Sequence, residues 1–175
     1  LQEGINFVPE DRHYHGLFKI RSISSNTTSA LLGSREMGKV DMNRRHQREI
    51  SQQYADKFRT KIVSLDDLIG SLSGGNQQKV ILGKWMASNV QLLIFDEPTK
   101  GIDVGTKSEI YKLMRGLADN GIGVIVVSSE MTELLGLCDR IAVMADGRIT
   151  AVYDAAEATE EKLARAATAE AGQSA

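Results

Sequence analysis

The sequence predicts an α/β fold with a mostly parallel sheet, on two observations. Apolar runs without polar alternation, typical of strands buried on both faces, occur at residues 92–95 and 124–127. Between them, residues 110–117 carry apolar side chains at the spacing of an amphipathic helix, and Asn120 and Gly121 end that helix. A strand, a helix and a further strand in this order require a crossover connection, which makes the two strands parallel.

The N-terminal part predicts one strand and then a helical, mostly solvated region. Residues 5–8 are β-prone and stop at Pro9, which cannot donate to a sheet. A polar loop follows over residues 10–16. From about residue 21 to 69 the chain is rich in Ser, Thr, Asn and charged residues. The apolar residues that recur there at helical spacing are Ile50, Tyr54 and Phe58.

A second helix is predicted to begin at Ser73, a residue type that caps helices. Its broad apolar face consists of Val80, Ile81, Trp85 and Met86. The strand over residues 92–95 comes next, and two carboxylates, Asp96 and Glu97, close it.

The C-terminal part predicts a further helix and a strand that join the same α/β sheet by a second crossover, then a turn, another strand and a helical tail. Residues 131–138 have helical spacing, and strands over 141–144 and 148–152 flank a turn at 145–147. From residue 154 onward the tail is rich in Ala and Glu, which favours a helix that frays toward its end.

Length and composition are those of a globular domain. The chain has 175 residues, of which 42% are hydrophobic and 25% are charged. The 21 Lys and Arg against 23 Asp and Glu give a formal charge of −2, which excludes a basic footprint for nucleic acid or for an anionic membrane. The single cysteine, Cys138, excludes an internal disulfide. No apolar run approaches the ~20 residues of a membrane span, so any membrane role requires a spanning partner.

The paired carboxylates Asp96 and Glu97 are the first candidate site, because open α/β sheets bind ligands at the carboxyl ends of their strands. One carboxylate can hold a magnesium ion. The other, on the opposite side by strand alternation, can orient and deprotonate a water that attacks phosphorus. The alternative is a pair of solvated acids at the end of a strand.

The second candidate site is the helix start at Ser73, Gly74, Gly75 and Asn76. Glycines without side chains let backbone N–H groups approach an anion, and the hydroxyl and the helix dipole complete a phosphate cradle. The alternative is an ordinary helix cap, and the order of the neighbouring segments decides between the two.

In that order the segments resemble the nucleotide-binding subunits of ABC transporters. Residues 72–77 are similar to the ABC signature motif, with Asn76 where Gln is commonest, and residues 92–97 are similar to the Walker B motif. Residues 100–103 resemble the D-loop that crosses to the partner domain. The resemblance covers about residues 5–152.

The resemblance implies a P-loop NTPase-like fold, here a partial ABC ATPase domain with a helical subdomain, and ATP and Mg²⁺ as cofactors. It implies that Asp96 holds the magnesium, through water, and that Glu97 is the catalytic base. Asp103 belongs to the D-loop. The implied nucleotide-binding residues of the signature are Ser73, Gly74, Gly75 and Asn76.

Two positions depart from the family pattern. Glu10 stands where the Q-loop has its Gln, and Ser129 stands at the His position of the switch strand, where it is the implied catalytic residue. Both changes predict an ATP site with impaired hydrolysis. With residues 9–12 and 73–79, they make the chain similar to the second ATPase domain of the fused ATP-binding subunits of bacterial importers of ribose, galactose and xylose.

That resemblance implies that the residues serve two different sites. Ser73, Gly74 and Gly75 reach across to complete the competent site of the other domain. The residues that line the degenerate site are Glu10, Asp96, Glu97 and Ser129.

The phosphate loop that such a site needs has one near match, at residues 33–40. That segment has the glycine spacing and Lys39, but Val40 supplies no hydroxyl, and a turn between helices is the better interpretation. We therefore expect the phosphate loop before Leu1 and the chain to be a C-terminal piece that is inactive alone.

The expected organisation has four segments. They are a Q-loop-like strand and loop at 1–16, a helical subdomain at 17–69, the α/β core at 70–153 and a tail helix at 154–175.

The function implied by the resemblance is an ATP-hydrolysing subunit of an ABC importer for a sugar or similar solute, at the cytoplasmic face of the cell membrane. Its partners are another ABC ATPase domain, transmembrane permease subunits and, indirectly, a periplasmic or extracellular solute-binding protein, with no nucleic acid. Two alternatives stay open: a hydrolysis-impaired regulatory half-site, and a soluble ABC ATPase outside transport. The charge of −2 argues against the second alternative.

Overall fold

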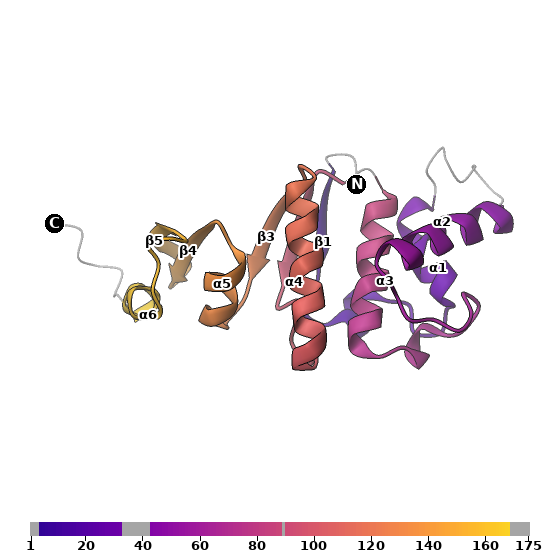
Figure 1. The fold of residues 1–175 in the computed structure, drawn as a ribbon, viewed down its shortest axis with the longest axis horizontal. Helices are drawn as coiled ribbons and strands as arrows, with labels where there is room; N and C mark the ends of the chain where they lie inside the picture. The colour runs from indigo at the N-terminus through magenta and orange to yellow at the C-terminus, as the bar shows by residue number, and fades with distance from the viewer. Residues whose placement is uncertain (1–3, 33–42, 89, 169–175) are drawn as a thin grey trace. The chain divides into compact units, whose positions relative to one another are not determined.

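The computed structural model describes residues 4–32, 43–88 and 90–168, which fall into two compact units, Leu1–Val127 and Ser128–Ala175 (Figure 1). The division lies inside the segment 70–153 that the sequence predicts as one core. None of the helices in the described ranges is long and apolar enough to cross a membrane.

The first unit is built on a three-stranded parallel sheet with the order β1-β2-β3. The strands are β1 (Ile5–Val8), β2 (Leu92–Asp96) and β3 (Gly123–Val127), and the register pairs Ile5 with Leu92 and Leu92 with Gly123. Helix α4 (Val104–Asp119) makes the crossover from β2 to β3, and Gly121 follows it with φ of 83°. The predicted α/β fold with parallel strands is confirmed.

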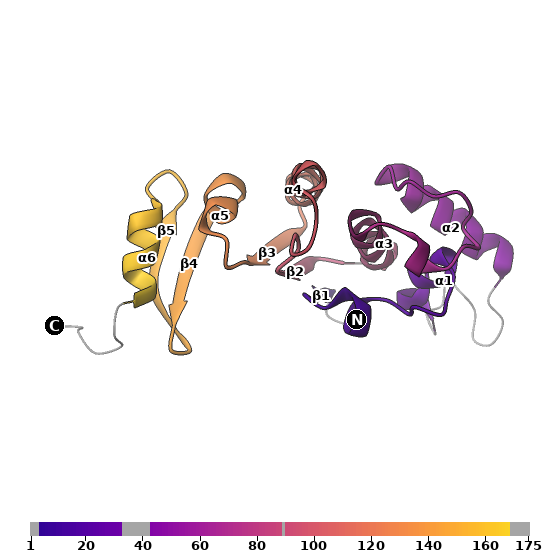
Figure 2. The same ribbon diagram turned by 90° about the horizontal axis from the view of Figure 1, so that it is seen from below.

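One face of this sheet is covered by helices. In Figure 2, α4 lies over one side of the sheet, and α3 (Gly74–Ala87) contacts both α4 and β1. The covered strand residues alternate with exposed ones, as the pleat requires. The fully buried residues that form this core include Val8, Leu93 and Phe95 of the strands and Ile81, Ile110 and Met114 of the helices.

The other face of the sheet is left open by the described residues. Ile5, Phe7, Ile125 and Val127 are each about half exposed there. Because side chains alternate along a strand, Asp96 points to the same face as Ile94 rather than to the buried face of Phe95. The open face therefore carries the strand-terminal carboxylate.

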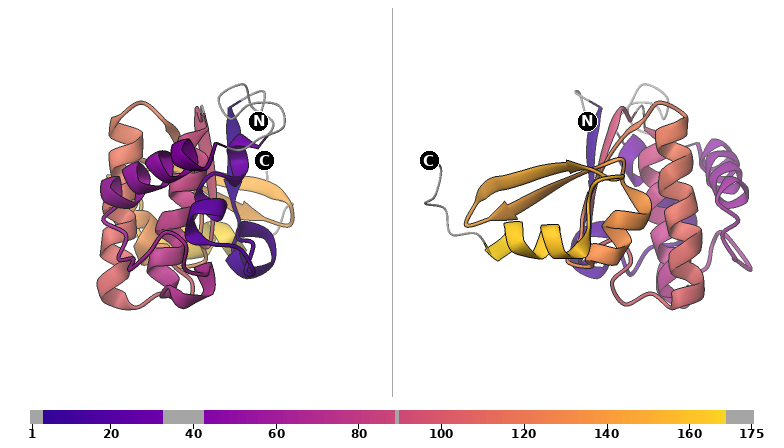
Figure 3. Two further views of the ribbon diagram at one scale, coloured as in Figure 1. Left: turned by 90° about the vertical axis from the view of Figure 1, so that its right-hand side faces the viewer. Right: turned by 60° about the vertical axis from the view of Figure 1, so that its left-hand side comes forward.

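The helical region contains α1 (Ile23–Thr27), α2 (Arg44–Lys57) and α3, which contact one another (Figure 3, left). The predicted solvated character holds for much of α2 but not for α1, most of whose residues are buried. The buried face of α2 also differs from the predicted stripe. It presents Gln47 and Ser51, while Ile50 and Tyr54 are only half-buried; of the predicted stripe, Phe58 at the end of α2 is buried.

This burial of polar residues is compensated by hydrogen bonds. The Gln47 amide donates to Thr28 Oγ1 at 3.0 Å, and the hydroxyls of Ser51 and Ser24 lie 3.0 Å apart. A buried polar group with a partner avoids most of its desolvation cost. Periodicity of apolar residues cannot detect such a face, because its members are polar.

Helix α3 buries two lysines with different partners. Lys79 donates to Glu109 Oε2 of α4 at 2.7 Å and to the Arg59 carbonyl at 3.3 Å. Lys84 donates to the Gly16 carbonyl at 2.8 Å, so its acceptor is a carbonyl rather than a carboxylate. Burial lowers the pKa of Lys84 from 10.5 to about 8, whereas Lys79 lowers the pKa of Glu109 by bonding to its carboxylate.

We expect the stability of the folded protein to rise with pH because of Lys84. Between pH ~8 and ~10.5 the unfolded chain keeps a proton on this lysine that the folded chain has lost, so higher pH favours folding. The rise is about 2 kcal/mol between pH ~7.5 and ~9.5. The difference in urea-unfolding free energy between wild type and Lys84→Met across this window measures it. A difference that does not change with pH would contradict the lowered pKa.

The second unit is a hairpin packed on helices. Strands β4 (Arg140–Ala145) and β5 (Arg148–Asp154) pair antiparallel in a sheet of their own, so the predicted second crossover into the parallel sheet is wrong for the described residues. Strand β5 extends two residues beyond the predicted 148–152. Asp146 and Gly147 have φ of 49° and 74°, which is typical of a two-residue type I′ turn.

The helices of this unit are α5 (Met131–Leu137) and α6 (Glu160–Thr168). The core is small and consists of Ile141, Val143, Leu163 and Ala166. The predicted tail helix begins at Glu160, after β5 and a turn, rather than at residue 154.

Candidate functional site

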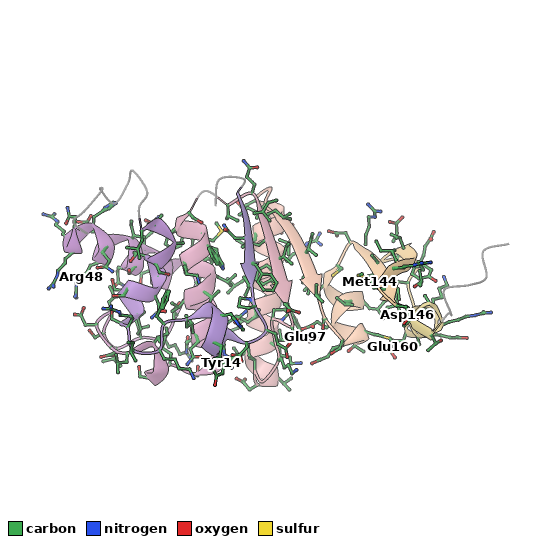
Figure 4. All side chains as sticks on the ribbon, turned by 180° about the vertical axis from the view of Figure 1, so that it is seen from behind. Tyr14, Arg48, Glu97, Met144, Asp146 and Glu160 are labelled. Carbon is green, nitrogen blue, oxygen red and sulfur yellow. The ribbon has the colours of Figure 1, made fainter. Side chains whose placement is uncertain are left out.

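The two adjacent carboxylates lie at the carboxyl end of the parallel sheet. Asp96 is the last residue of β2, and Glu97 follows with φ of 43°, in the left-handed region that costs a non-glycine residue energy. The Glu97 N–H donates to the Val127 carbonyl at 2.8 Å, which fixes this backbone against β3. Figure 4 labels Glu97 at this end of the sheet. Because Glu97 has left strand conformation, the strand alternation used in the sequence prediction does not set its direction.

Glu10 lies close to this end of the sheet, because β1 pairs with β2 and the loop after β1 begins there. Its carboxylate forms an ion pair with Lys100, from the segment after β2. Glu10 raises the pKa of Lys100, first by this hydrogen bond and then by its charge, and Glu97 and Asp96 add smaller effects of the same sign. Lys100 thus brings a positive charge to three acidic residues, whereas the sequence analysis placed it only at the start of the segment that resembles the D-loop.

These acids fit a magnesium ion that is bound mainly by a substrate. In the parts of the chain that the structure describes, no three His, Cys, Asp or Glu side chains gather as a metal cage. Mg²⁺ seldom uses such a cage, because it keeps several waters and binds through one or two carboxylates plus phosphate oxygens. Asp96, at the strand end on the open sheet face, has the right donor type for that mode.

The second candidate site is the start of α3. Ser73 is the N-cap residue in extended conformation, but its side chain makes no capping hydrogen bond, in contrast to the sequence prediction. Its hydroxyl instead accepts from the Asn76 amide at 3.0 Å, and Asn76 Oδ1 accepts from the Lys61 N–H at 2.9 Å. Since the first N–H groups of a helix lack intrahelical acceptors, this end retains donors for an anion.

The two glycines at this helix start make close contacts with other segments, and the contact at Gly75 is the tighter one. A Cβ on Gly74 would lie 2.7 Å from Arg12 Nη2, and a Cβ on Gly75 would lie 2.1 Å from Thr106 Cγ2. The first glycine therefore admits the guanidinium of the loop after β1, and the second admits the first turn of α4. The sequence prediction considered only the approach of a phosphate.

Asp103 caps α4. Its Oδ1 accepts the Thr106 N–H at 2.9 Å, and its Oδ2 accepts the Thr106 hydroxyl at 2.7 Å. These two bonds are the main reason why the pKa of Asp103 is lowered. The spacing Asp-x-x-Thr is a capping pattern that the sequence displays. Because Thr106 also touches Gly75, the position predicted as the D-loop and the position predicted as the signature meet at one side chain.

Arg12 joins the two candidate sites. Its Nη1 donates to the Lys100 carbonyl at 3.3 Å, while Nη2 lies against Gly74. Glu10 and Arg12 therefore hold Lys100 from two directions, by a charge and by a backbone bond. No local sequence signal connects residues this far apart.

Ser129 belongs to the second unit, where it is exposed. Its neighbour Ser128 bonds to the Glu133 carboxylate and accepts the Glu130 N–H at 3.1 Å, which orders the start of α5. The structure therefore places Glu10, Asp96, Glu97, Asp103 and the signature residues in one unit and Ser129 in the other. The near match to a phosphate loop at 33–40 lies outside the described residues.

Comparison with known proteins finds a family. A family model described as "ABC transporter" matches residues 1–100. The chain is 46% identical over 170 residues to the putative ribose/galactose/methyl galactoside import ATP-binding protein 1 of Agrobacterium fabrum, and 46% identical over 171 residues to the L-arabinose transport ATP-binding protein of Geobacillus stearothermophilus. Each alignment covers 96% of this chain and 33% of the relative, so the chain spans about a third of the length of these proteins.

Solved structures show the same fold. A dimeric ATP-binding cassette bound to ADP and phosphate in a post-hydrolysis state matches with a TM-score of 0.71 and 22% identity, over 86% of this chain and 62% of that one. An inward-facing transporter of the metal-chelate type matches with a TM-score of 0.74 and 18% identity, over 93% of this chain and 62% of that one.

Proposed function

This chain belongs to the ABC transporter family, and we propose that it is part of the ATP-binding and ATP-hydrolysing subunit of a sugar importer. The observation that carries the proposal is the meeting of Glu10, Asp96 and Glu97 at the carboxyl end of a parallel sheet, next to a glycine-rich helix start. The names of relatives at 46% identity, which are sugar import and transport ATP-binding proteins, support the solute class.

In the proposed site, Asp96 would hold a Mg²⁺ ion that binds together with the phosphates of ATP, and that ion would supply neutralisation of charge during phosphoryl transfer. Glu97 orients and deprotonates the attacking water, and its left-handed backbone, tied to β3, keeps the carboxylate in a constant place.

The signature helix start serves the opposite site. Ser73 presents its hydroxyl, and the N–H groups of Gly74 and Gly75 face the γ-phosphate held by a second ABC ATPase domain. Asn76 supports this arrangement by holding both the Ser73 hydroxyl and the Lys61 backbone. Ser129 stands at the proposed switch position, in the second unit.

A transmembrane permease is the proposed membrane partner, and a solute-binding protein acts through it. Residues 14–20 expose large apolar side chains, which include Tyr14 at 81%, Phe18 at 59% and Ile20 at 84% (Tyr14 is labelled in Figure 4). Such a group on one short segment favours protein contact. The subunit then works at the cytoplasmic face of the membrane.

Sugar uptake by a strain that lacks the gene tests the proposal. We expect loss of uptake of at least one of ribose, galactose, arabinose and xylose, restored by the full-length gene, and Mg²⁺-dependent ATP hydrolysis by the purified full-length protein. Wild-type uptake of all these sugars by the deletion strain would overturn the proposed solute class. Absence of Mg²⁺-dependent ATP hydrolysis would overturn the proposed ATPase activity.

A second candidate function is a regulatory half-site that binds ATP without turning it over. Two observations favour it. The Glu10 carboxylate forms an ion pair with the Lys100 ammonium group. The proposed switch position holds the exposed Ser129, which has no imidazole to offer the reaction. The hydrolysis measurement on a Glu97 variant, given in the Discussion, discriminates between the two functions.

A further inference from the structure

Lys84 is a buried cation at the middle of the signature helix. Its side chain is 7% exposed, and its ammonium group lies 4.3 Å from the centre of the Trp85 ring. The Nζ donates to the Gly16 carbonyl at 2.8 Å, across 68 residues of sequence. The proposed chemistry at Asp96 and Glu97 assigns no role to this lysine.

The contact between α3 and Gly16 is tight. A Cβ on Gly16 would lie 3.0 Å from Ile81 Cδ1, 3.4 Å from Arg12 Cβ and 3.7 Å from Pro9 Cγ. Ile81 and Lys84 are neighbours on one face of α3, since they are three residues apart. Gly16 thus rests on Ile81 while Lys84 holds its carbonyl.

Gly16 is the last residue of a π-helical turn over Arg12–Gly16. The final carbonyls of any helical turn lack partners within the turn, so the Lys84 ammonium takes the place of a C-terminal cap. π-Helical turns are uncommon and occur often at functional sites. The lysine therefore stabilises an irregular segment rather than a regular helix.

The loop that ends at Gly16 begins at the candidate site. Glu10 pairs with Lys100, and Arg12 donates to the Lys100 carbonyl and lies against Gly74. The loop therefore has one end near the carboxylates and the other on α3, the helix whose start is the signature. Holding the Gly16 end on α3 fixes how far Glu10 and Arg12 can move from that helix.

Keeping a charge at this place is unfavourable for folding. Desolvation by burial is the cause of the lowered pKa of Lys84. A buried methionine of similar length would fill the same space without a charge to desolvate. A charge that disfavours folding and holds a loop of the candidate site is typical of a functional position.

We propose that Lys84 is a positioning residue for ATP turnover, which holds the loop from Glu10 to Gly16 on the signature helix. The proposal rests on the proposed ATPase function, and it adds a residue that contacts neither nucleotide nor metal.

The test compares Lys84→Met, Lys84→Arg and Lys79→Met in the full-length protein. Lys79 is a matched control, because it is buried on the same helix but bonds to Glu109 and Arg59. The measurements are kcat and KM for ATP, thermal stability, and hydrogen–deuterium exchange of residues 10–16.

For Lys84→Met we expect a fall in kcat of about tenfold with little change in KM, faster exchange in residues 10–16, and no loss of thermal stability. Lys84→Arg, which keeps a charged donor, restores most of kcat. Lys79→Met lowers thermal stability and leaves exchange of residues 10–16 at the wild-type rate.

Wild-type kcat and exchange in Lys84→Met would overturn the proposal. So would a fall in kcat that is accompanied by a matching fall in thermal stability, or a Lys84→Arg variant without recovery. A wild-type protein without ATPase activity contradicts the proposed function instead, and the exchange measurement then still tests the hold of Lys84 on the loop.

Discussion

Replacing Glu97 with Gln in the full-length protein is expected to reduce Mg²⁺-dependent ATP hydrolysis by about a hundredfold or more, with ATP binding retained. The amide keeps the size of the side chain and the φ of 43° that places it, but it cannot accept a proton from the attacking water. Steady-state hydrolysis measured beside equilibrium binding of an ATP analogue separates the loss of chemistry from the loss of binding.

The matched control is Asp119→Asn, which removes an exposed carboxylate from the end of α4, where it lies 3.4 Å from Arg115 Nε. This variant should hydrolyse ATP at the wild-type rate. If Glu97→Gln also retains wild-type turnover, this half-site contributes no hydrolysis, and the regulatory alternative replaces the proposed role of Glu97.

Replacing Gly75 with Ala is expected to lower the free energy of unfolding by about 3 kcal/mol. The new Cβ would lie 2.1 Å from Thr106 Cγ2 and 3.3 Å from Thr106 Cβ, so a real displacement is required. Thr106 cannot rotate away without losing the bond from its hydroxyl to Asp103 Oδ2. The variant therefore loses stability either because α3 moves away from α4 or because α4 loses its cap. Urea unfolding measures the change.

A second substitution makes this prediction specific. Thr106→Ser removes Cγ2, which is the clashing atom, and keeps the hydroxyl that bonds to Asp103. The double variant should recover most of the stability lost in Gly75→Ala. Gly116→Ala in α4 is the control, because no atom lies within 4 Å of its added Cβ, and it should be neutral or stabilising by up to about 1 kcal/mol. Equal losses in the single and double variants would show that Thr106 is not the cause.

The parts of the candidate site that lie within one short segment could be predicted from the sequence. An apolar run that ends in Asp96 and Glu97 indicates a strand whose carboxylates lie at a sheet edge, and β2 has that form. Ser73 before two glycines indicates a helix start, and α3 begins at Gly74. Both signals are local, because a strand or a helix start depends on neighbouring residues.

The supporting residues of the site were not predictable in this way. Lys100 pairs with a residue 90 positions away, and Arg12 donates to a carbonyl 88 positions away. Both contacts form only because β1 pairs with β2, which brings the loop after β1 next to the segment after β2. Thr106 has one contact of each kind. Its bond to Asp103 is local and predictable, while its contact with Gly75 depends on the packing of α3 against α4.

By itself, the sequence determined the strands, the helices and the position of the acids along the chain, because apolar periodicity and capping residues act over a few residues. Only the tertiary structure decided which polar groups are buried and what compensates them. Gln47 and Ser51 turn inward because Thr28 and Ser24 are there to bond with them. Lys84 keeps a buried ammonium because the carbonyl of Gly16 lies against it. The cost of burying a polar group depends on its partners, and the fold brings those partners from distant parts of the chain.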